Sequence, residues 1–129
     1  MKRSLAYGMF PGFFSADAST KTYFSQPELF ERDRPLFKKY VPLCKLVAEA
    51  GWQPITLATS SDAKVYVERF GDKYFTVFND SQENKTVTLR FEKDFAEFKE
   101  LVSGKTVKVE NGALTLTLSP EDVAVLAVE

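Results

Sequence analysis

The chain has no histidine, one cysteine and no long hydrophobic run, and each of these shortages excludes a class of function. Without histidine there is no Ser-His-Asp or Cys-His catalytic arrangement, and the commonest metal ligand is missing. A single cysteine, Cys44, cannot form an internal disulfide. No apolar stretch approaches the roughly 20 residues that a membrane-spanning helix needs. We therefore expect no cofactor, no metal site and no membrane partner.

A strong charge of either sign is also missing. The net charge is −1 over 129 residues and the basic residues are scattered, which gives no indication of a nucleic-acid or anionic-membrane partner. The basic start at Lys2 and Arg3 is followed by an apolar stretch that ends at Pro11-Gly12, too short and too interrupted for a secretory signal. Together with the lone cysteine, these features predict a cytoplasmic location by default.

What the chain does contain is the composition of an ordinary globular protein. Hydrophobic residues make up 44% and charged residues 27%, and the length suits one hydrophobic core better than two. Aromatic residues reach 14%, twelve of them phenylalanine. We therefore expect a core rich in aromatic rings.

The second half of the chain alternates between apolar and polar side chains, the period of a half-buried β-strand. Residues 86–91 are one such run, and Asn111-Gly112 is the strongest short signal for a tight hairpin turn. Residues 123–128 are apolar on both faces, as in a central strand that is covered on both sides. We predict a mainly β fold, with an antiparallel β-sandwich of about 7–8 strands over residues 52–129.

Residues 1–51 lack this alternation. They predict a loop and α-helical segment that packs against the sandwich without forming an independent domain. Within them, residues 4–10 predict a short strand that ends at Pro11-Gly12. Trp52 follows directly after the last predicted helix, and we expect it to pin that helix against the sheet rather than to face solvent.

Two helices are predicted before residue 52. Ser25, with Glu28 three residues later, forms a capping box and predicts a short helix. Asp33, with Pro35 just inside, predicts the N-cap of a second helix that ends at Gly51. The apolar side chains of this second helix recur at spacings of three and four, which makes one face: Leu36, Phe37, Tyr40, Leu43, Cys44, Val47 and Ala48. We expect this face to dock on the sandwich, with its cysteine a buried core residue rather than a nucleophile.

Six aromatic side chains gather in the first 24 residues: Tyr7, Phe10, Phe13, Phe14, Tyr23 and Phe24. Exposed rings stack on the C–H faces of sugars, and tyrosine adds a polar group. Asp17 supplies a carboxylate in the same segment. The candidate carbohydrate-binding residues are therefore Tyr7, Phe10, Phe13, Phe14, Asp17 and Tyr23. The alternative, that these rings fill a core or an interface, is favoured because phenylalanine outnumbers tyrosine and tryptophan.

Three segments resemble the end of a glycoside hydrolase-like protein. Residues 5–14 (LAYGMFPGFF) resemble the last strand of a (β/α)₈ barrel with its loop, and residues 31–43 resemble the closing helix. Residues 50–54 (AGWQP) resemble the junction to a C-terminal β-sandwich, and the remainder is similar to the accessory sandwich of such enzymes. The resemblance implies a non-catalytic accessory module, or a fragment, of a carbohydrate-active enzyme with a structural role. Because most barrel strands are absent, it assigns no catalytic residue here.

Other functions and assemblies remain open. The chain could be a stand-alone carbohydrate-binding module that uses the N-terminal aromatics, a small hydrolase with two surface carboxylates, or a protein-interaction domain. An apolar strand without neighbours invites association, so residues 4–14 predict a homodimer through this segment. The alternative is that residues 4–14 add an edge strand to the sandwich. Carbohydrate is the expected class of ligand, and we expect no catalytic activity from this chain alone.

Overall fold

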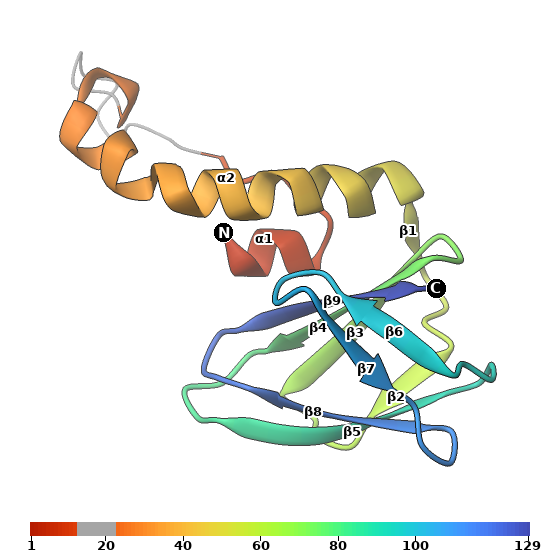
Figure 1. Ribbon diagram of the computed structural model, residues 1–129. Helices are drawn as coiled ribbons and strands as arrows, with labels where there is room; N and C mark the ends of the chain where they lie inside the picture. The colour runs from red at the N-terminus through yellow and green to blue at the C-terminus, as the bar shows by residue number, and fades with distance from the viewer. Residues whose placement is uncertain (13–22) are drawn as a thin grey trace.

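A computed structural model describes residues 1–12 and 23–129, and it shows two antiparallel β-sheets with helices on one side (Figure 1). The larger sheet contains, in spatial order, β1 (Trp52–Gln53), β3 (Val65–Phe70), β4 (Tyr74–Asn79), β9 (Val123–Val128), β6 (Glu97–Glu100) and β7 (Lys105–Lys108). The smaller sheet contains β2 (Ala58–Ser60), β5 (Lys85–Phe91) and β8 (Ala113–Leu118). The predicted mainly β fold with an antiparallel sandwich is confirmed, with nine strands among the described residues.

The first hydrophobic core lies between the two sheets. Alternate side chains of the strands point into it, among them Val87 and Leu89 from β5 and Leu126 from β9. At one end of this core four phenylalanine rings meet with centroids 4.9–6.0 Å apart: Phe75, Phe91, Phe95 and Phe98. Tilted and edge-on ring contacts of this kind add to the stabilisation that burial alone provides. The expected aromatic core is therefore present in the sandwich.

Strand β9 lies between β4 and β6 in the middle of the larger sheet. Ala124 and Leu126 point into the core between the sheets, whereas Val123 and Val125 point to the other face, toward the helices. All four side chains are buried. This explains why the segment is apolar at successive positions, and it confirms the prediction of a central strand covered on both sides.

The helices cover the outer face of the larger sheet. They are α1 (Lys2–Ala6) and α2 (Pro27–Ala50), with a 3₁₀ turn η1 (Tyr23–Ser25) before α2. Helix α1 lies between α2 and the sheet (Figure 1), and it buries Leu5 completely. A second core forms there from Leu5, Ala6, Tyr40, Cys44, Val47, Phe70, Phe78, Val123 and Val125. Neither helix, among the residues described, is long and apolar enough to cross a bilayer.

The prediction of a strand over residues 4–10 is wrong, because the chain begins with helix α1. This helix is held by contacts that are remote in sequence: the Thr76 hydroxyl donates to the Ala6 carbonyl at 2.6 Å, and Lys2 pairs with Asp122 at 2.8 Å. A short apolar segment of this kind does not by itself distinguish a strand from a helix. Tertiary packing selects the helix, and the segment does not add an edge strand to the sandwich.

The prediction of two helices divided at Asp33 is also wrong, since α2 runs unbroken from Pro27 to Ala50. Its N-cap is Gln26, and Pro27 occupies the first turn, where a missing N–H costs nothing. Pro35 and Pro42 lie inside the helix on exposed positions. The carbonyl groups that these prolines leave unpaired therefore have access to water, and the helix continues.

Two turns that contain glycine were predicted, at Gly51 and at Asn111-Gly112, and both are present. Gly51 ends α2 with φ of +82°, and its N–H reaches the carbonyls of Val47 and Ala48, as predicted for a helix terminus. Asn111 and Gly112 both have positive φ, which defines the tight turn that was predicted. The strands on either side, β7 and β8, nevertheless belong to different sheets. This turn therefore links the two layers instead of closing a hairpin within one.

Candidate functional site

The six candidate carbohydrate-binding residues are only partly described by the structure. Phe13, Phe14 and Asp17 lie outside the described residues, as does the side chain of Phe24. Tyr7 follows α1 and is half-buried, and Phe10 is 57% exposed in the segment beyond it. A carbohydrate-binding role for these residues stays a prediction.

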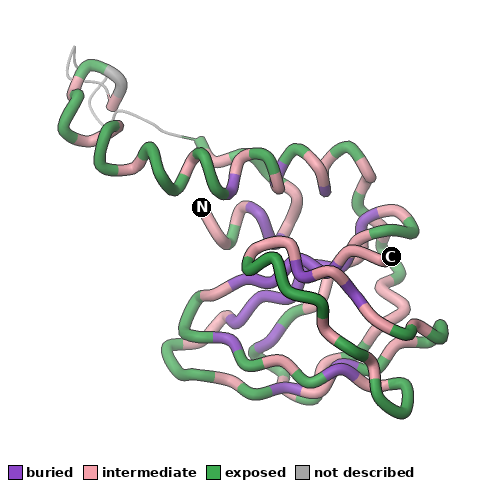
Figure 2. The backbone as a smooth tube through the Cα atoms, in the orientation of Figure 1, coloured by how far each residue is buried: buried purple, intermediate pink, exposed green. Residues whose placement is uncertain are grey.

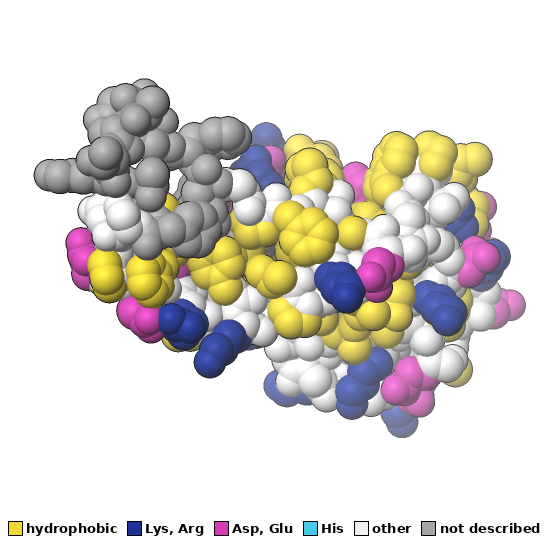
Figure 3. All heavy atoms as spheres, turned by 90° about the horizontal axis from the view of Figure 1, so that it is seen from above, with side chains coloured by type: hydrophobic (Ala, Val, Ile, Leu, Met, Phe, Trp, Pro, Cys, Tyr) yellow, Lys and Arg dark blue, Asp and Glu magenta, His cyan; other side chains and the backbone are white. Residues whose placement is uncertain are grey.

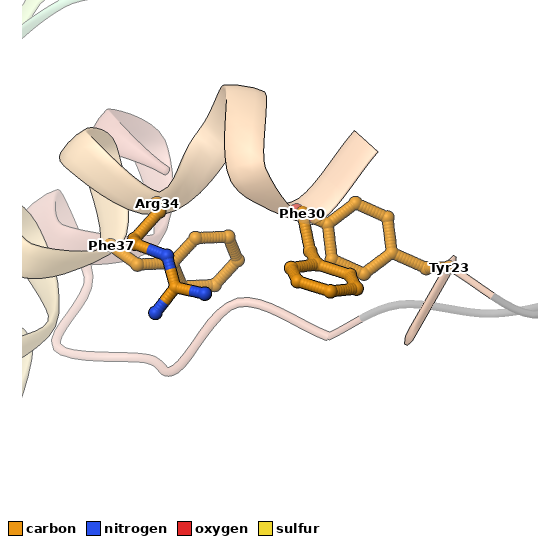
Figure 4. Close-up of a pocket in the computed structure, with 4 residues that line it drawn as sticks. All are labelled: Tyr23, Phe30, Arg34 and Phe37. Carbon is orange, nitrogen blue, oxygen red and sulfur yellow. The ribbon is translucent and has the colours of Figure 1, made fainter. Parts of the chain in front are cut away.

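Tyr23 contributes to a hollow on the N-terminal half of α2. The hollow has a volume of about 330 Å³ and is lined by Tyr23, Phe30, Arg34 and Phe37. Figure 4 shows these side chains on the side of α2 that faces the N-terminal segment of the chain. The Tyr23 and Phe37 rings lie 6.4 Å apart, and the guanidinium of Arg34 lies 5.9 Å from the Phe30 ring centroid. The lining is therefore mainly aromatic with one cation at its edge.

The charged groups around this hollow are paired with one another. The Tyr23 hydroxyl donates to Asp33 Oδ2 at 3.0 Å, and Arg32 donates to both oxygens of Asp33. These hydrogen bonds from Arg32, and then from Tyr23, lower the pKa of Asp33. Arg34 donates through Nε to Glu31 at 2.7 Å. Asp33 is thus an ionised partner of Arg32 and not a helix cap.

The apolar face of α2 continues beyond the part that packs on the sandwich. Tyr40, Cys44 and Val47 are buried, whereas Leu36, one turn earlier, is 47% exposed. Figure 2 shows the same division, with buried positions only along the C-terminal half of the helix. Sequence reasoning placed Leu36 on the correct face of the helix. It missed that the sandwich ends before this face does, because local pattern carries no information on where the neighbouring layer stops.

The segment after α1 runs beside this exposed half of α2. Pro11 and Gly12 line the same hollow as Leu36 and Phe37, and the neighbouring Met9 and Phe10 are 56% and 57% exposed. We call Met9, Phe10, Phe30, Leu36 and Phe37 together the overhang surface. Figure 3, viewed from the helical side, shows hydrophobic side chains at the surface toward both ends of this face.

Trp52 does not pin the helix against the sheet, contrary to the prediction. Its side chain is 55% exposed, and its indole Nε1 donates to Glu68 Oε2 on β3 at 2.7 Å. Gly51 turns the chain sharply at the end of α2, so that Trp52 starts the edge strand β1 beside β3. The indole therefore lies on the sheet rather than beneath the helix.

Glu100 and Asp122 line one common hollow of about 460 Å³. The Glu100 carboxylate accepts hydrogen bonds from the backbone N–H groups of Val102, Ser103 and Val125 at 2.7–3.0 Å. Asp122 accepts from Lys2. Both carboxylates therefore have partners within the fold.

The cysteine also has a structural role. Cys44 is completely buried in the second core, and burial raises the pKa of its thiol, as expected for an unreactive core cysteine. Among residues 1–12 and 23–129, no cluster of three or more His, Cys, Asp or Glu side chains has a geometry suited to a metal ion.

No protein-family model matches this sequence, and no curated protein sequence matches it. Solved structures do match. AmyP, solved in complex with maltose, superposes with a TM-score of 0.57 at 21% identity, over 77% of this chain and 21% of AmyP. An Anoxybacillus α-amylase matches over 85% of this chain and 24% of its own, at 15% identity and a TM-score of 0.45. A β-galactosidase from Bacillus circulans sp. alkalophilus matches over 67% and 12%, at 24% identity and a TM-score of 0.39.

The superposition on AmyP is a likeness of fold. AmyP shares the fold of most of this chain over one part of its own length, so the predicted resemblance is confirmed at the level of the fold. The chain spans only 21% of the length of AmyP. It is therefore similar to one part of such a protein and not to the whole.

Proposed function

We propose that this chain is a non-catalytic accessory β-sandwich module of a carbohydrate-active enzyme, and that its role is structural. In this role the overhang surface packs against the catalytic domain of that enzyme. The superposition on part of AmyP supports the class of partner. The absence of histidine from the sequence and the structural use of Glu100 and Asp122 support a role without catalysis.

One observation carries the proposal, namely the division of α2 into two halves. Its C-terminal half buries Tyr40, Cys44 and Val47, while its N-terminal half presents Leu36 in a hollow that Pro11 also lines. Exposed apolar side chains that gather on one face are typical of a surface that another protein covers. A rigid helix that is already fixed at one end presents such a surface with little loss of conformational entropy on binding.

Site-specific cross-linking tests this role directly. A photo-activatable phenylalanine analogue replaces Leu36 in the chain as it is expressed in its own cells, and the cross-linked product is identified by mass spectrometry. We expect a cross-link to a carbohydrate-active enzyme domain, either on a separate chain or within the same polypeptide. The matched control carries the analogue at Thr115, an exposed position on the smaller sheet far from α2, and should give no such product.

The identity of the cross-linked partner decides the outcome. Cross-linking to a carbohydrate-active catalytic domain, lost when Phe10 is changed to Asp, supports the proposal. Cross-linking to a second copy of this chain would instead favour the homodimer predicted through residues 4–14. Cross-linking to a protein that does not act on carbohydrates, or to nothing, would reject the proposal. In the structure Leu5 and Ala6 are buried within the chain itself, so a dimer would have to use the exposed residues that follow them.

A carbohydrate-binding module that uses the N-terminal aromatics is the second candidate. The observation in its favour is the exposure of Phe10 at 57%, next to a half-buried Tyr7. Isothermal titration with oligosaccharides tests it. If the Phe10→Ala variant binds sugar with the same affinity as the parent chain, Phe10 is not part of the binding site.

A further inference from the structure

Trp52 is held in a fixed position at the edge of the larger sheet. It starts β1, lies opposite Phe70 of β3 in register, and donates its only N–H to Glu68 Oε2 at 2.7 Å. Because the indole has no second donor, what it presents to solvent is apolar ring surface. More than half of the side chain, 55%, is exposed. An exposed ring that is already oriented loses little conformational entropy when a flat ligand stacks on it.

Other aromatic and polar groups lie beside this ring. Tyr66 and Glu68 are two residues apart on β3, so their side chains share one face of the sheet. The Tyr66 side chain is 38% exposed. Among the described residues nothing donates to Glu68 Oε1, which leaves this carboxylate oxygen available as an acceptor.

Helix α1 brings Tyr7 to the same place. The Thr76 hydroxyl holds the Ala6 carbonyl, and Thr76 lies opposite Glu68 in register on the neighbouring strand. The next residue, Tyr7, is therefore placed over β3. Its surroundings agree with this position, because burial raises the pKa of the Tyr7 hydroxyl and the nearby charges of Asp80 and Glu68 raise it further. Tyr7 thus borders the exposed rings on the side of α1.

The chemistry of this surface fits an uncharged sugar chain. A pyranose ring offers an apolar C–H face for the indole and hydroxyl donors for a carboxylate, and a hydroxyl bound to an ionised acceptor makes a strong hydrogen bond. Nucleic acid would also stack on the rings, but its phosphates would meet the negative charge of Glu68, whereas the Asp80 carboxylate is paired with Arg3. The combination of stacking rings and a carboxylate acceptor therefore favours a neutral carbohydrate.

We propose that Trp52, Tyr66 and Glu68, bordered by Tyr7, form a binding site for a neutral oligosaccharide chain. The site lies at the C-terminal end of α2, at the opposite end of this helix from the overhang surface (Figure 1). It differs from the N-terminal aromatic cluster because its main contacts come from β1 and β3. The choice of carbohydrate as ligand rests on the proposed function, whereas the arrangement of the site does not.

Trp52 is the only tryptophan in the chain, so its fluorescence reports on this site alone. The purified chain is titrated with maltoheptaose, cellohexaose and a galactan-derived oligosaccharide in separate experiments. We expect a saturable blue shift of the Trp52 emission with at least one of these probes, because a stacked sugar displaces water from the indole. The absence of a saturable change with all three, in a chain that is folded by circular dichroism, would overturn the proposal.

Variants separate this site from unspecific binding. Tyr66→Ala keeps the Trp52 reporter and should weaken binding about tenfold, the loss expected for one stacking ring. Glu68→Gln should weaken binding about threefold or more, because its charged acceptor is lost. Trp52→Ala, followed by isothermal titration, should abolish binding. The matched control is Ile55→Ala, which removes a 66% exposed apolar side chain outside the site and should leave the affinity within roughly twofold.

The same variants can also reject the proposal. Parental affinity in Tyr66→Ala and Glu68→Gln would overturn it, and Tyr66→Ala serves as the deciding variant if Trp52→Ala fails to fold. The two proposals fail separately. Sugar binding without cross-linking at position 36 rejects the docking role only, and cross-linking without sugar binding rejects this site only.

Discussion

The sandwich and the helical layer each bury one hydrophobic core, but their sequences specify these cores in different ways. In the sandwich, alternate residues of each strand point inward, as Leu89 of β5 and Leu126 of β9 do. In the helical layer, α1 has only five residues, too few for an isolated helix to be stable in water. Its helical form depends on Thr76 of β4 and on Asp122, which directly precedes β9, and both lie more than 65 residues later in the chain.

This difference shows in which part of the chain the local sequence pattern is sufficient to predict secondary structure. Both errors in secondary structure, the strand at residues 4–10 and the break at Asp33, fall in the helical layer. The strands after Trp52 follow the predicted period. The helical layer should therefore depend on contacts with the sandwich for its structure. The core between the two sheets, in contrast, is built mainly from residues of the sandwich itself.

Phe98→Ala gives the largest expected effect and tests the sandwich half of the comparison. Phe98 is completely buried and contacts the rings of Phe75, Phe91 and Phe95. The lost contacts and the remaining cavity should lower the free energy of unfolding by about 3–5 kcal/mol, measured by urea denaturation. Phe10→Ala, an exposed phenylalanine, is the matched control and should change stability by less than about 0.5 kcal/mol. Equal effects in the two variants would contradict the assigned core.

Leu5→Ala tests the helical half. Leu5 is completely buried between α2 and the sheet, and its loss should cost about 2–5 kcal/mol if this layer unfolds together with the sandwich. Leu89→Ala, equally buried between the sheets, is the matched variant. Hydrogen exchange measures both. If Leu5→Ala accelerates exchange only in α1 and α2 and leaves the strands protected, the two layers are separate cooperative units.

Gly8→Ala tests how tightly α1 and the residues after it pack against the sheet. Gly8 has φ of +65°, and an added Cβ would lie 2.5 Å from Cε1 of Phe70. Gly112, with φ of +71° and no atom within 4 Å of an added Cβ, is the matched control. Left-handed backbone costs about 1–2 kcal/mol in each variant. Displacement of the Phe70 ring should destabilise Gly8→Ala by about 1–3 kcal/mol more. Equal thermal unfolding of the two variants would show that α1 is free to move away.

The smallest effects are expected at the two extremes of pH. In the sandwich, the backbone N–H of Lys64 and the Lys85 ammonium lower the pKa of Asp62 below its ordinary 3.8. Its contribution to stability is therefore complete above that value and is lost as the pH falls through the lower folded pKa. Unfolding measured between acidic and neutral pH should depend less on pH in Asp62→Asn. An unchanged acid limb would exclude this interaction.

The helical layer should show the opposite dependence. A hydrogen bond to Asp122 raises the pKa of Lys2 above its ordinary 10.5, although partial burial opposes this shift. The contribution of Lys2 is therefore complete below that value and is lost as the pH rises through the higher folded pKa. Lys2→Met should flatten the alkaline limb of the stability curve. An alkaline limb as steep as that of the parent chain would contradict this assignment.

The candidate surfaces were less accessible to sequence reasoning than the fold. The exposure of Leu36 depends on where the sandwich ends beneath α2, and the position of Trp52 depends on the pairing of β1 with β3. Neither contact is local. The pairing of Trp52 with Glu68 is visible in the sequence only as two residues 16 positions apart, with no pattern to join them.

The sequence by itself determined the strands after Trp52, because alternation with a period of two decides which side chains can be buried in a sheet. It also determined the end of α2 at Gly51, because glycine adopts a positive φ without a steric penalty. Only the tertiary structure decided that the chain begins with a helix, that α2 extends past its support, and that the Asn111-Gly112 turn joins two different sheets. These features depend on contacts between residues far apart in the chain, whose free energy outweighs the weak preferences of short segments.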